Sequence, residues 1–195
     1  MVPPFGFMMR LSYYSLPFFL CASVAAQQSA PSFRLDAGSR VAVQETDHVM
    51  VKTFTPARSV KAGSRISLFL DISPKPKMHV YAPGQQDYIP VSIALGKDAF
   101  IKPHPPVFPA AEKYFFKPLN ETQLVYSKPF RIVQDVTLAE RLPDKKSTLT
   151  ITGTVRYQAC DDAICYFPKT VPVAWTLRLP VVREFEIANP HPPSR

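Results

Sequence analysis

Alternation of apolar and polar residues with a period of two is the feature that most restricts the fold of this chain. In the segment RISLFLDIS, every even position from Ile66 to Ile72 is apolar. In TLTITGTVRY, the apolar residues instead occupy odd positions between Leu149 and Tyr157. Successive side chains of a strand point to opposite faces of a sheet, so each segment predicts a β-strand with one buried face.

Further strands are predicted along the chain, and no stripe with a helical period accompanies them. The turn sequences KAGS (61–64) and LPDKKS (142–147) separate such segments, and a proline-rich crossing over 101–122 is too long for an ordinary hairpin loop. The 22 prolines and 6 glycines fit short strands joined by irregular loops. Seven or eight strands of this kind predict an all-β fold, an immunoglobulin-like antiparallel β-sandwich.

The first 26 residues have the pattern of a secretory signal peptide. One positive charge, Arg10, precedes an apolar stretch over 11–24, and small residues lead up to Ala26, where we expect cleavage. The apolar stretch is too short for a stable membrane insertion, and Cys21 should leave with the signal. The expected organisation is therefore a signal peptide (1–26), a flexible N-terminal segment (27–47), the sandwich domain (48–183) and a loose tail (184–195), in a periplasmic protein.

Charge and composition argue against several classes of function. The chain carries 23 basic and 15 acidic residues, a formal net charge of +8. The basic residues are scattered, which indicates a solvated surface and no nucleic-acid partner. No metal-ligand spacing, phosphate-binding loop or Ser/His/Asp set is recognisable, so we expect neither a metal nor a cofactor.

Cleavage of the signal would leave two cysteines, Cys160 and Cys165, in the segment QACDDAIC. Their C-x4-C spacing differs from the C-x-x-C of thioredoxin active sites. Four intervening residues suit a short hairpin, in which the two cysteines could lie opposite one another at a Cα separation of about 4.5 Å. By strand parity Cys160 lies on the even face with Arg156 and Gln158, away from the centre of the sandwich.

The register of this hairpin requires one additional residue. If Cys160 lies opposite Cys165, then inward-facing Val155 lies opposite Thr170 and not opposite Val171. Val171 nevertheless begins the apolar face of the return strand, which continues through alternate residues to Leu179. Because proline favours bulges and sheet edges, Pro168 predicts a bulge over 167–170.

Two interpretations of the cysteine pair stand open on these grounds. A disulfide that closes so few residues contributes only about 2 kcal/mol in the loop-entropy model, which makes it a modest staple. The same bond at a sheet edge is an accessible target for an incoming thiolate. The pair is either the structural disulfide of an exported binding or assembly module, or a redox-active pair.

The cysteine segment resembles that of the N-terminal periplasmic domain in the DsbD family of thiol:disulfide interchange proteins. In that family the segment reads approximately Y-Q-x-C-x-D-x-x-C-x-P-P-x-T-x-x-V. Phe167 stands where the first of two prolines is usual. ISPKPKMHVYAPG (72–84) resembles a second family segment, an aromatic strand beside the disulfide. The motif is matched by Tyr157, Gln158, Cys160, Asp162, Cys165, Pro168, Thr170 and Val173.

This resemblance implies an immunoglobulin-like fold and a protein-disulfide reductase that relays electrons to or from thioredoxin-like redox proteins. Cys165 would form the mixed disulfide and Cys160 would resolve it. The electron source would be another polypeptide, such as a separate membrane electron transporter. An aromatic cap is expected in AEKYFFKPLN (111–120), with Phe115 or Phe116 as its lid. The residues expected to line the site are His79, Tyr81, Tyr157, Gln158, Asp162 and Tyr166.

The acidic residues after Cys160 have two interpretations. Asp161 and Asp162 would raise the pKa of a neighbouring thiol through like-charge repulsion, which suits a slow, partner-gated donor. They equally fit ordinary turn chemistry, in which a short carboxylate accepts hydrogen bonds from the backbone that follows it.

Overall fold

Antiparallel strands make up most of the secondary structure, and the long strands coincide with the alternating segments of the sequence. The computed structural model describes residues 34–35, 41–57, 59–143 and 146–180, and within them no α-helix occurs. The elements are β1 (Arg34–Leu35), β2 (Ala42–Glu45), β3 (Val49–Phe54), β4 (Arg65–Pro74), β5 (His79–Tyr81), β6 (Ser92–Leu95), β7 (Ile101–Pro103), β8 (Glu112–Phe116), the 3₁₀ turn η1 (Lys117–Leu119), β9 (Glu121–Tyr126), β10 (Phe130–Leu138), β11 (Thr148–Tyr157), β12 (Ala159–Cys160) and β13 (Lys169–Arg178).

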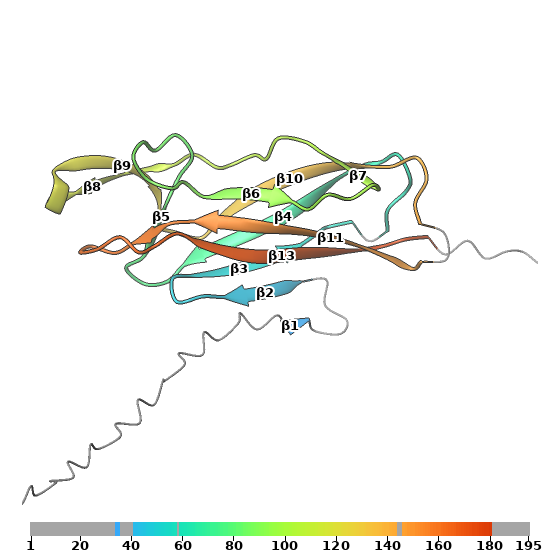
Figure 1. Ribbon diagram of the computed structural model, residues 1–195, viewed down its shortest axis with the longest axis horizontal. Helices are drawn as coiled ribbons and strands as arrows, with labels where there is room; N and C mark the ends of the chain where they lie inside the picture. Colours follow the sequence, from blue (N-terminus) through green and yellow to red (C-terminus); the bar gives the residue numbers. More distant parts are fainter. Residues whose placement is uncertain (1–33, 36–40, 58, 144–145, 181–195) are drawn as a thin grey trace, which may run out of the picture. The chain divides into compact units, whose positions relative to one another are not determined.

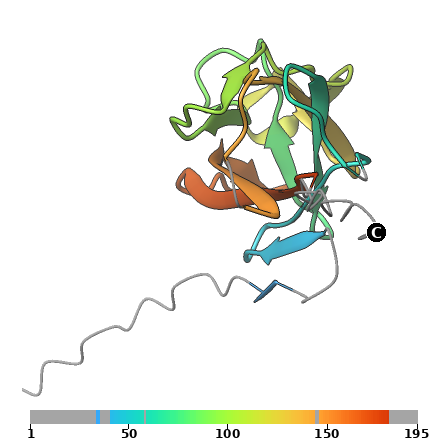
Figure 2. The same cartoon turned by 90° about the vertical axis from the view of Figure 1, so that its right-hand side faces the viewer.

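The strands form three sheets, two of which face each other across the core. The larger sheet has the order β1-β2-β3-β4-β10-β7, and the facing sheet has the order β13-β11-β6. Figure 2 shows β11 and β13, in orange and red, as a layer apart from the teal strands of the larger sheet. A smaller sheet with the order β12-β5-β9-β8 lies at one end of this sandwich (Figure 1). The fold is an immunoglobulin-like antiparallel β-sandwich, as the alternation predicts.

The parity predicted for the last two long strands is confirmed. Val155 pairs with Val171 and Ile151 pairs with Trp175, so both strands turn their apolar sets to the same face. Trp175 is buried, and its indole N–H donates to the carbonyl of Phe69 in the opposite layer at 2.9 Å. The main core joins this face to the buried side chains of β3, β4 and β10, including Val49, Val51, Leu68, Leu70, Ile72, Ile132, Val136, Leu149, Tyr157, Val173 and Leu177.

Two stretches are more regular than the sequence indicates. Residues 42–45, inside the segment expected to be flexible (27–47), form β2, which pairs with β3. The inward residues of β2 are Ala42 and Gln44, a small and a polar side chain, so its burial leaves no apolar pattern in the sequence. The proline-rich crossing over 101–122 contains β7 and β8 and reaches the start of β9.

Several expectations concern residues outside the described ranges. The signal peptide over 1–26 and the tail over 184–195 both lie outside the described residues. Among the residues that are described, no helix combines the length and the apolar character needed to span a membrane.

The packing of Ile151 against the opposite layer yields a stability prediction. Ile151→Ala should lower the free energy of unfolding by about 2–5 kcal/mol, because it leaves a cavity beside Trp175. Thr150→Ala, on the exposed face of the same strand, should cost at most about 1 kcal/mol. Urea unfolding followed by the fluorescence of the single tryptophan measures both changes. Equal losses in the two variants would contradict the assigned faces.

Candidate functional site at the cysteine hairpin

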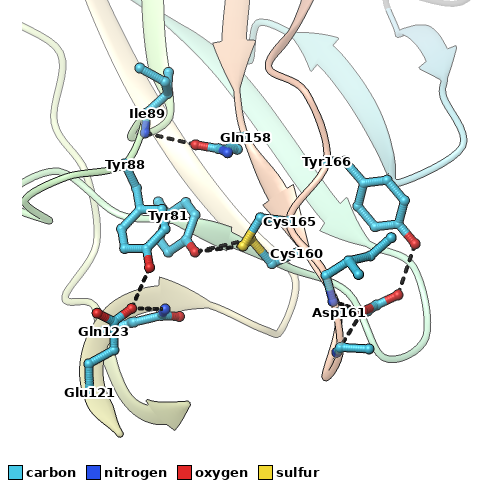
Figure 3. Close-up of a disulfide and its surroundings, with 12 residues drawn as sticks. Tyr81, Tyr88, Ile89, Glu121, Gln123, Gln158, Cys160, Asp161, Cys165 and Tyr166 are labelled. Atoms are coloured by element: carbon cyan, nitrogen blue, oxygen red, sulfur yellow. Dashed lines mark hydrogen bonds between the residues drawn. A yellow bond between two sulfur atoms is a disulfide. The ribbon is translucent and has the colours of Figure 1, made fainter. Parts of the chain in front are cut away.

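The two cysteines face each other at the end of the β11–β13 hairpin and form a disulfide. Their Cα atoms lie 4.1 Å apart, and the two residues form an antiparallel bridge. Backbone hydrogen bonds flank the bridge on both sides, from Tyr166 N–H to Ala159 O at 2.9 Å and from Asp161 N–H to Ile164 O at 3.0 Å. The cysteines therefore occupy the non-hydrogen-bonded pair that the C-x4-C spacing suggests (Figure 3).

One extra residue separates the register of the disulfide from that of the long ladder. The ladder ends with Tyr157 opposite Lys169, and the next pair is Cys160 opposite Cys165. Between these pairs, one arm has two residues (158–159) and the other has three (166–168). The predicted extra residue is present, but it lies in 166–168 and not over 167–170, because Thr170 is already back in the ladder opposite Arg156.

Asp161 builds the turn between the cysteines. Its Oδ1 accepts the backbone N–H groups of Ala163 and Ile164, both at 2.8 Å, and its Oδ2 accepts the hydroxyl of Tyr166 at 2.8 Å. The backbone bond from Ile164, followed by that from Ala163, lowers the pKa of Asp161. Asp162 accepts a hydrogen bond from the hydroxyl of Tyr114 at 2.9 Å. Asp161 thus stabilises the turn, and Asp162 connects the turn to Tyr114 of β8.

The two cysteine residues differ in their exposure to solvent. Cys160 is 0% exposed, whereas Cys165 is exposed. Cys160 belongs to a small cluster with Tyr81 and Val125, separate from the main core, as its parity predicts. Its full burial limits the expected accessibility of the disulfide to the side of Cys165. The cause is a change of sheet after Tyr157, because β12 leaves the β11–β13 ladder and pairs with β5.

The hydroxyl of Tyr81 lies against both sulfurs. It is 3.0 Å from Sγ of Cys160 and 3.2 Å from Sγ of Cys165. Burial, as the largest cause, raises the pKa of Tyr81 far above its ordinary range, so this group remains a hydrogen-bond donor at neutral pH. Its ring stacks on that of Tyr88, with centroids 4.2 Å apart. The Tyr88 hydroxyl in turn donates to the carboxylate of Glu121 (Figure 3).

His79 is the direct cross-strand neighbour of Cys160, as the resemblance implies. The two residues pair between β5 and β12, and His79 is buried. Its ring packs against Tyr114 at a centroid distance of 4.8 Å and edge-on against Tyr81 at 6.0 Å. Burial lowers the pKa of His79, so its imidazole is neutral at pH 7.

The other predicted lining residues have varied positions. Gln158 accepts the backbone N–H of Ile89 at 3.0 Å, which ties the hairpin to the loop before β6. Tyr157 lies in the main core, where its hydroxyl shares a 2.8 Å hydrogen bond with Thr46. Tyr166 stands beside Cys165 and packs against His48. Of these three residues, Tyr166 lies beside the exposed Cys165. Gln158 and Tyr157 instead attach the hairpin to other parts of the fold.

The two phenylalanines proposed as a lid lie on opposite faces of β8. Phe116 pairs with Glu121 and Phe115 with Thr122. The odd-numbered residues of β9 lie on the cysteine face, since Val125 clusters with Cys160. Phe116 therefore shares this face and is buried, while Phe115 points to the other face and is 53% exposed.

Several residues of the site have no counterpart in the sequence prediction. Gln123 is buried, and its amide donates to the carboxylate of Glu121. Tyr88, Tyr114, Glu121 and Gln123 come from the loop before β6 and from the β8–β9 hairpin. The alternation of Tyr114 with Phe116, and of Glu121 with Gln123 and Val125, could have indicated two strands with one face toward the cysteines. The prolines of this segment instead favoured its interpretation as an irregular crossing. No group of three or more His, Cys, Asp or Glu side chains suited to a metal ion occurs within the described residues.

The sequence profile of the family described as "Thiol:disulfide interchange protein DsbD, N-terminal" matches residues 48–176, more than half of the chain. The chain belongs to this family. Domains of the DsbD N-terminal family are thiol–disulfide exchange domains that interact with thioredoxin-like proteins. Disulfide oxidoreductase activity is thus a general property of the group.

Two solved structures match parts of this chain. One is the N-terminal periplasmic domain of ScsB from Proteus mirabilis, with a TM-score of 0.45 and 11% identity, over 76% of this chain and 50% of that one. The other is the reduced DsbD N-terminal domain from Neisseria meningitidis, with a TM-score of 0.37 and 16% identity, over 60% of this chain and 82% of that one. The chain thus spans about half the length of the ScsB structure. Among curated proteins, none matches this sequence.

The face assignment of β8 predicts which aromatic residue protects the disulfide. Tyr114→Ala should speed reduction of the bond by a small thiol several-fold, because Tyr114 packs on His79 and holds Asp162. Phe115→Ala, one residue away on the opposite face, should leave the rate unchanged. Stopped-flow reduction of the two purified variants compares them directly. If only the Phe115 variant were reduced faster, the face of β8 that bears Phe115, and not the face that bears Tyr114, would cover the disulfide.

Proposed function

We propose that this chain is a periplasmic thiol–disulfide exchange protein that carries electrons between thioredoxin-fold partners through Cys160 and Cys165. The observation that carries the proposal is the unequal exposure of the two cysteine residues. Cys165 is exposed and Cys160 is buried against Tyr81. In a disulfide with one exposed and one buried cysteine, an incoming thiolate reaches the exposed cysteine more easily, and the buried cysteine is then the leaving group.

The first half-reaction begins with the thiolate of a reduced partner. That thiolate attacks Sγ of Cys165, the bond between the two sulfurs breaks, and Cys160 leaves as a thiolate. The hydroxyl of Tyr81, 3.0 Å from Sγ of Cys160, is placed to donate a hydrogen bond to the new charge. The second thiol of the partner, as thiolate, then attacks the partner's own linked sulfur. Cys165 is released, and the partner departs with its own disulfide.

The second half-reaction returns these two electrons to an oxidised partner. The thiolate of Cys165 attacks the disulfide of that partner and forms a mixed disulfide. Cys160, as thiolate, attacks Sγ of Cys165, which restores the intramolecular bond and releases the partner in its reduced form. The short separation of the cysteines supports this resolving role. We place the electron source in another polypeptide with a thioredoxin-like domain, such as a membrane electron transporter.

The division of labour between the cysteines gives the decisive experiment. Cys160→Ser should accumulate mixed disulfides through Cys165, because the resolving thiol is missing. Cys165→Ser should trap little, because its remaining thiol is buried. Non-reducing electrophoresis after expression in an oxidising periplasm, with identification of the linked peptide, measures both. Equal trapping by the two variants would contradict the assigned roles.

The reduction potential separates this function from a structural disulfide in a binding or assembly module. An exchange protein should have a potential within the range of known thiol–disulfide relays, whereas a structural bond falls below about −300 mV. Equilibration with glutathione or thioredoxin gives the value. A potential below that limit, together with an absence of trapping in both variants, would favour the structural role.

Export is part of the same proposal. The sequence before Gln27 supports cleavage after Ala26, and the mature protein should then begin at Gln27 and lack Cys21. Intact-mass measurement of the protein purified from the periplasm checks the new terminus. Recovery of a chain that retains Cys21, with or without a lipid, would contradict this part of the proposal.

A further inference from the structure

The turn between β2 and β3, Thr46–His48, contacts both arms of the cysteine hairpin although more than 100 residues separate them in sequence. The hydroxyls of Thr46 and Tyr157 share a hydrogen bond of 2.8 Å. Lys169 forms an ion pair with Asp47 at 2.6 Å. These two contacts attach the turn to the last pair of the long ladder, Tyr157 and Lys169.

The third contact reaches past the ladder to the residue beside the exposed sulfur. The imidazole of His48 packs on the ring of Tyr166, with centroids 4.3 Å apart and planes inclined by 35°. Tyr166 directly follows Cys165 and is the first residue of the three-residue arm (166–168) that lies outside the regular ladder. Tyr166 is also held by its backbone N–H bond to Ala159 and by its hydroxyl bond to Asp161. The remaining residues of the arm, 167–168, have no partner in the ladder, so the packing of His48 adds a contact on the side where regular pairing is interrupted.

The surroundings of His48 favour the neutral imidazole. His48 is 6% exposed, its ring also meets that of Tyr157 edge-on at 6.5 Å, and Nδ1 has no hydrogen-bond partner among the described residues. Four charged groups face it: Asp47 from its own turn, Lys75 after β4, Lys169 of β13 and Asp161 of the hairpin turn. Burial is the largest influence and lowers the pKa of His48. The two lysines add to this effect, and the two carboxylates oppose it.

We propose that His48 is a positioning residue for the exchange site, whose neutral ring holds Tyr166 and thereby Cys165, and whose protonation releases this side of the hairpin. The proposal rests on the proposed function only for the statement that Cys165 is the attacked sulfur. It adds that the rate of reduction at Cys165 depends on pH, through a histidine in a turn that lies outside the cysteine motif.

The direction of the pH effect follows from proton linkage. An imidazole released to water has an ordinary pKa of about 6.5, higher than that of the packed ring. The released hairpin therefore binds more protons than the packed one, and falling pH favours release. The packed arrangement is fully favoured above about pH 6.5, and this advantage is lost as the pH falls through the lower pKa of the packed state. Reduction at Cys165 should accelerate over the same interval.

Two variants of His48 test this in the mature, oxidised protein. His48→Phe keeps an aromatic ring on Tyr166 but cannot be protonated, while His48→Ala removes the ring. Reduction rates with a phosphine are measured from about pH 5.5 to pH 8 and divided by the rate of the Phe variant, which cancels the reagent's own pH dependence. We expect the wild-type ratio to rise several-fold toward acid pH. The Ala variant should reduce several-fold faster than wild type at pH 8.

A histidine elsewhere in the sandwich supplies the matched control. His104 bonds to Thr137 on β10 and is remote from the cysteines in the sheet order, so His104→Gln should retain the wild-type profile. Acid acceleration that persists undiminished in the Phe variant would overturn the proposal, as would an Ala variant that reduces at the wild-type rate at pH 8.

A measurement on the unmutated protein covers the case in which a variant fails to fold. In an NMR titration, the ring signals of His48 and Tyr166 should change with one common midpoint below about pH 6.5. Tyr166 signals that do not respond while His48 titrates would overturn the proposal. Neither experiment needs a redox partner, so failure to trap a partner and failure of the acid effect are separate outcomes.

Discussion

Two registers that differ by one residue meet in a single hairpin, and the geometry of the site depends on this mismatch. The long ladder places Val155 opposite Val171 because both must face the core. The disulfide places Cys160 opposite Cys165 because a bond of this kind needs directly opposed residues. No regular hairpin satisfies both, so the return arm carries an extra residue in 166–168. That arm bears Phe167, which is 93% exposed and lies two residues after Cys165.

The change of sheet after Tyr157 explains why a local disulfide has one buried sulfur. Had β11 continued in its own ladder, Cys160 would lie on the polar face with Arg156, which is exposed. Instead, β12 pairs with β5, and the same parity turns Cys160 toward Tyr81 and Val125. Between Tyr157 and Cys160, the strand face that is polar and exposed in the β11–β13 sheet becomes a buried face of the β12–β5 sheet. Burial of Cys160 is thus a property of the topology and not of the cysteine motif.

Local pattern was sufficient to predict much of the fold and the centre of the site. The alternation in β4, β11 and β13 gave their core faces, and the spacing of Cys160 and Cys165 with the parity of Val171 gave the extra residue. The family resemblance placed His79 and Tyr81 beside the disulfide. The rest depends on tertiary contacts without a local signature. Gln44 faces inward on β2 although it is polar, and Phe115 and Phe116 are distinguished only by the pairing of β8 with β9.

Formation of the disulfide and burial of Cys160 require different parts of the chain to come together during folding. Closing the disulfide requires two cysteines five positions apart, a short loop that an unfolded segment visits often and at little entropic cost. Enclosing Cys160 requires β5 and β9, and bracing Tyr166 requires a turn more than 100 residues earlier. Such long-range contacts form slowly. A newly made chain in an oxidising environment can therefore form the disulfide before it is folded, and its two cysteines become unequal only when the distant strands have paired.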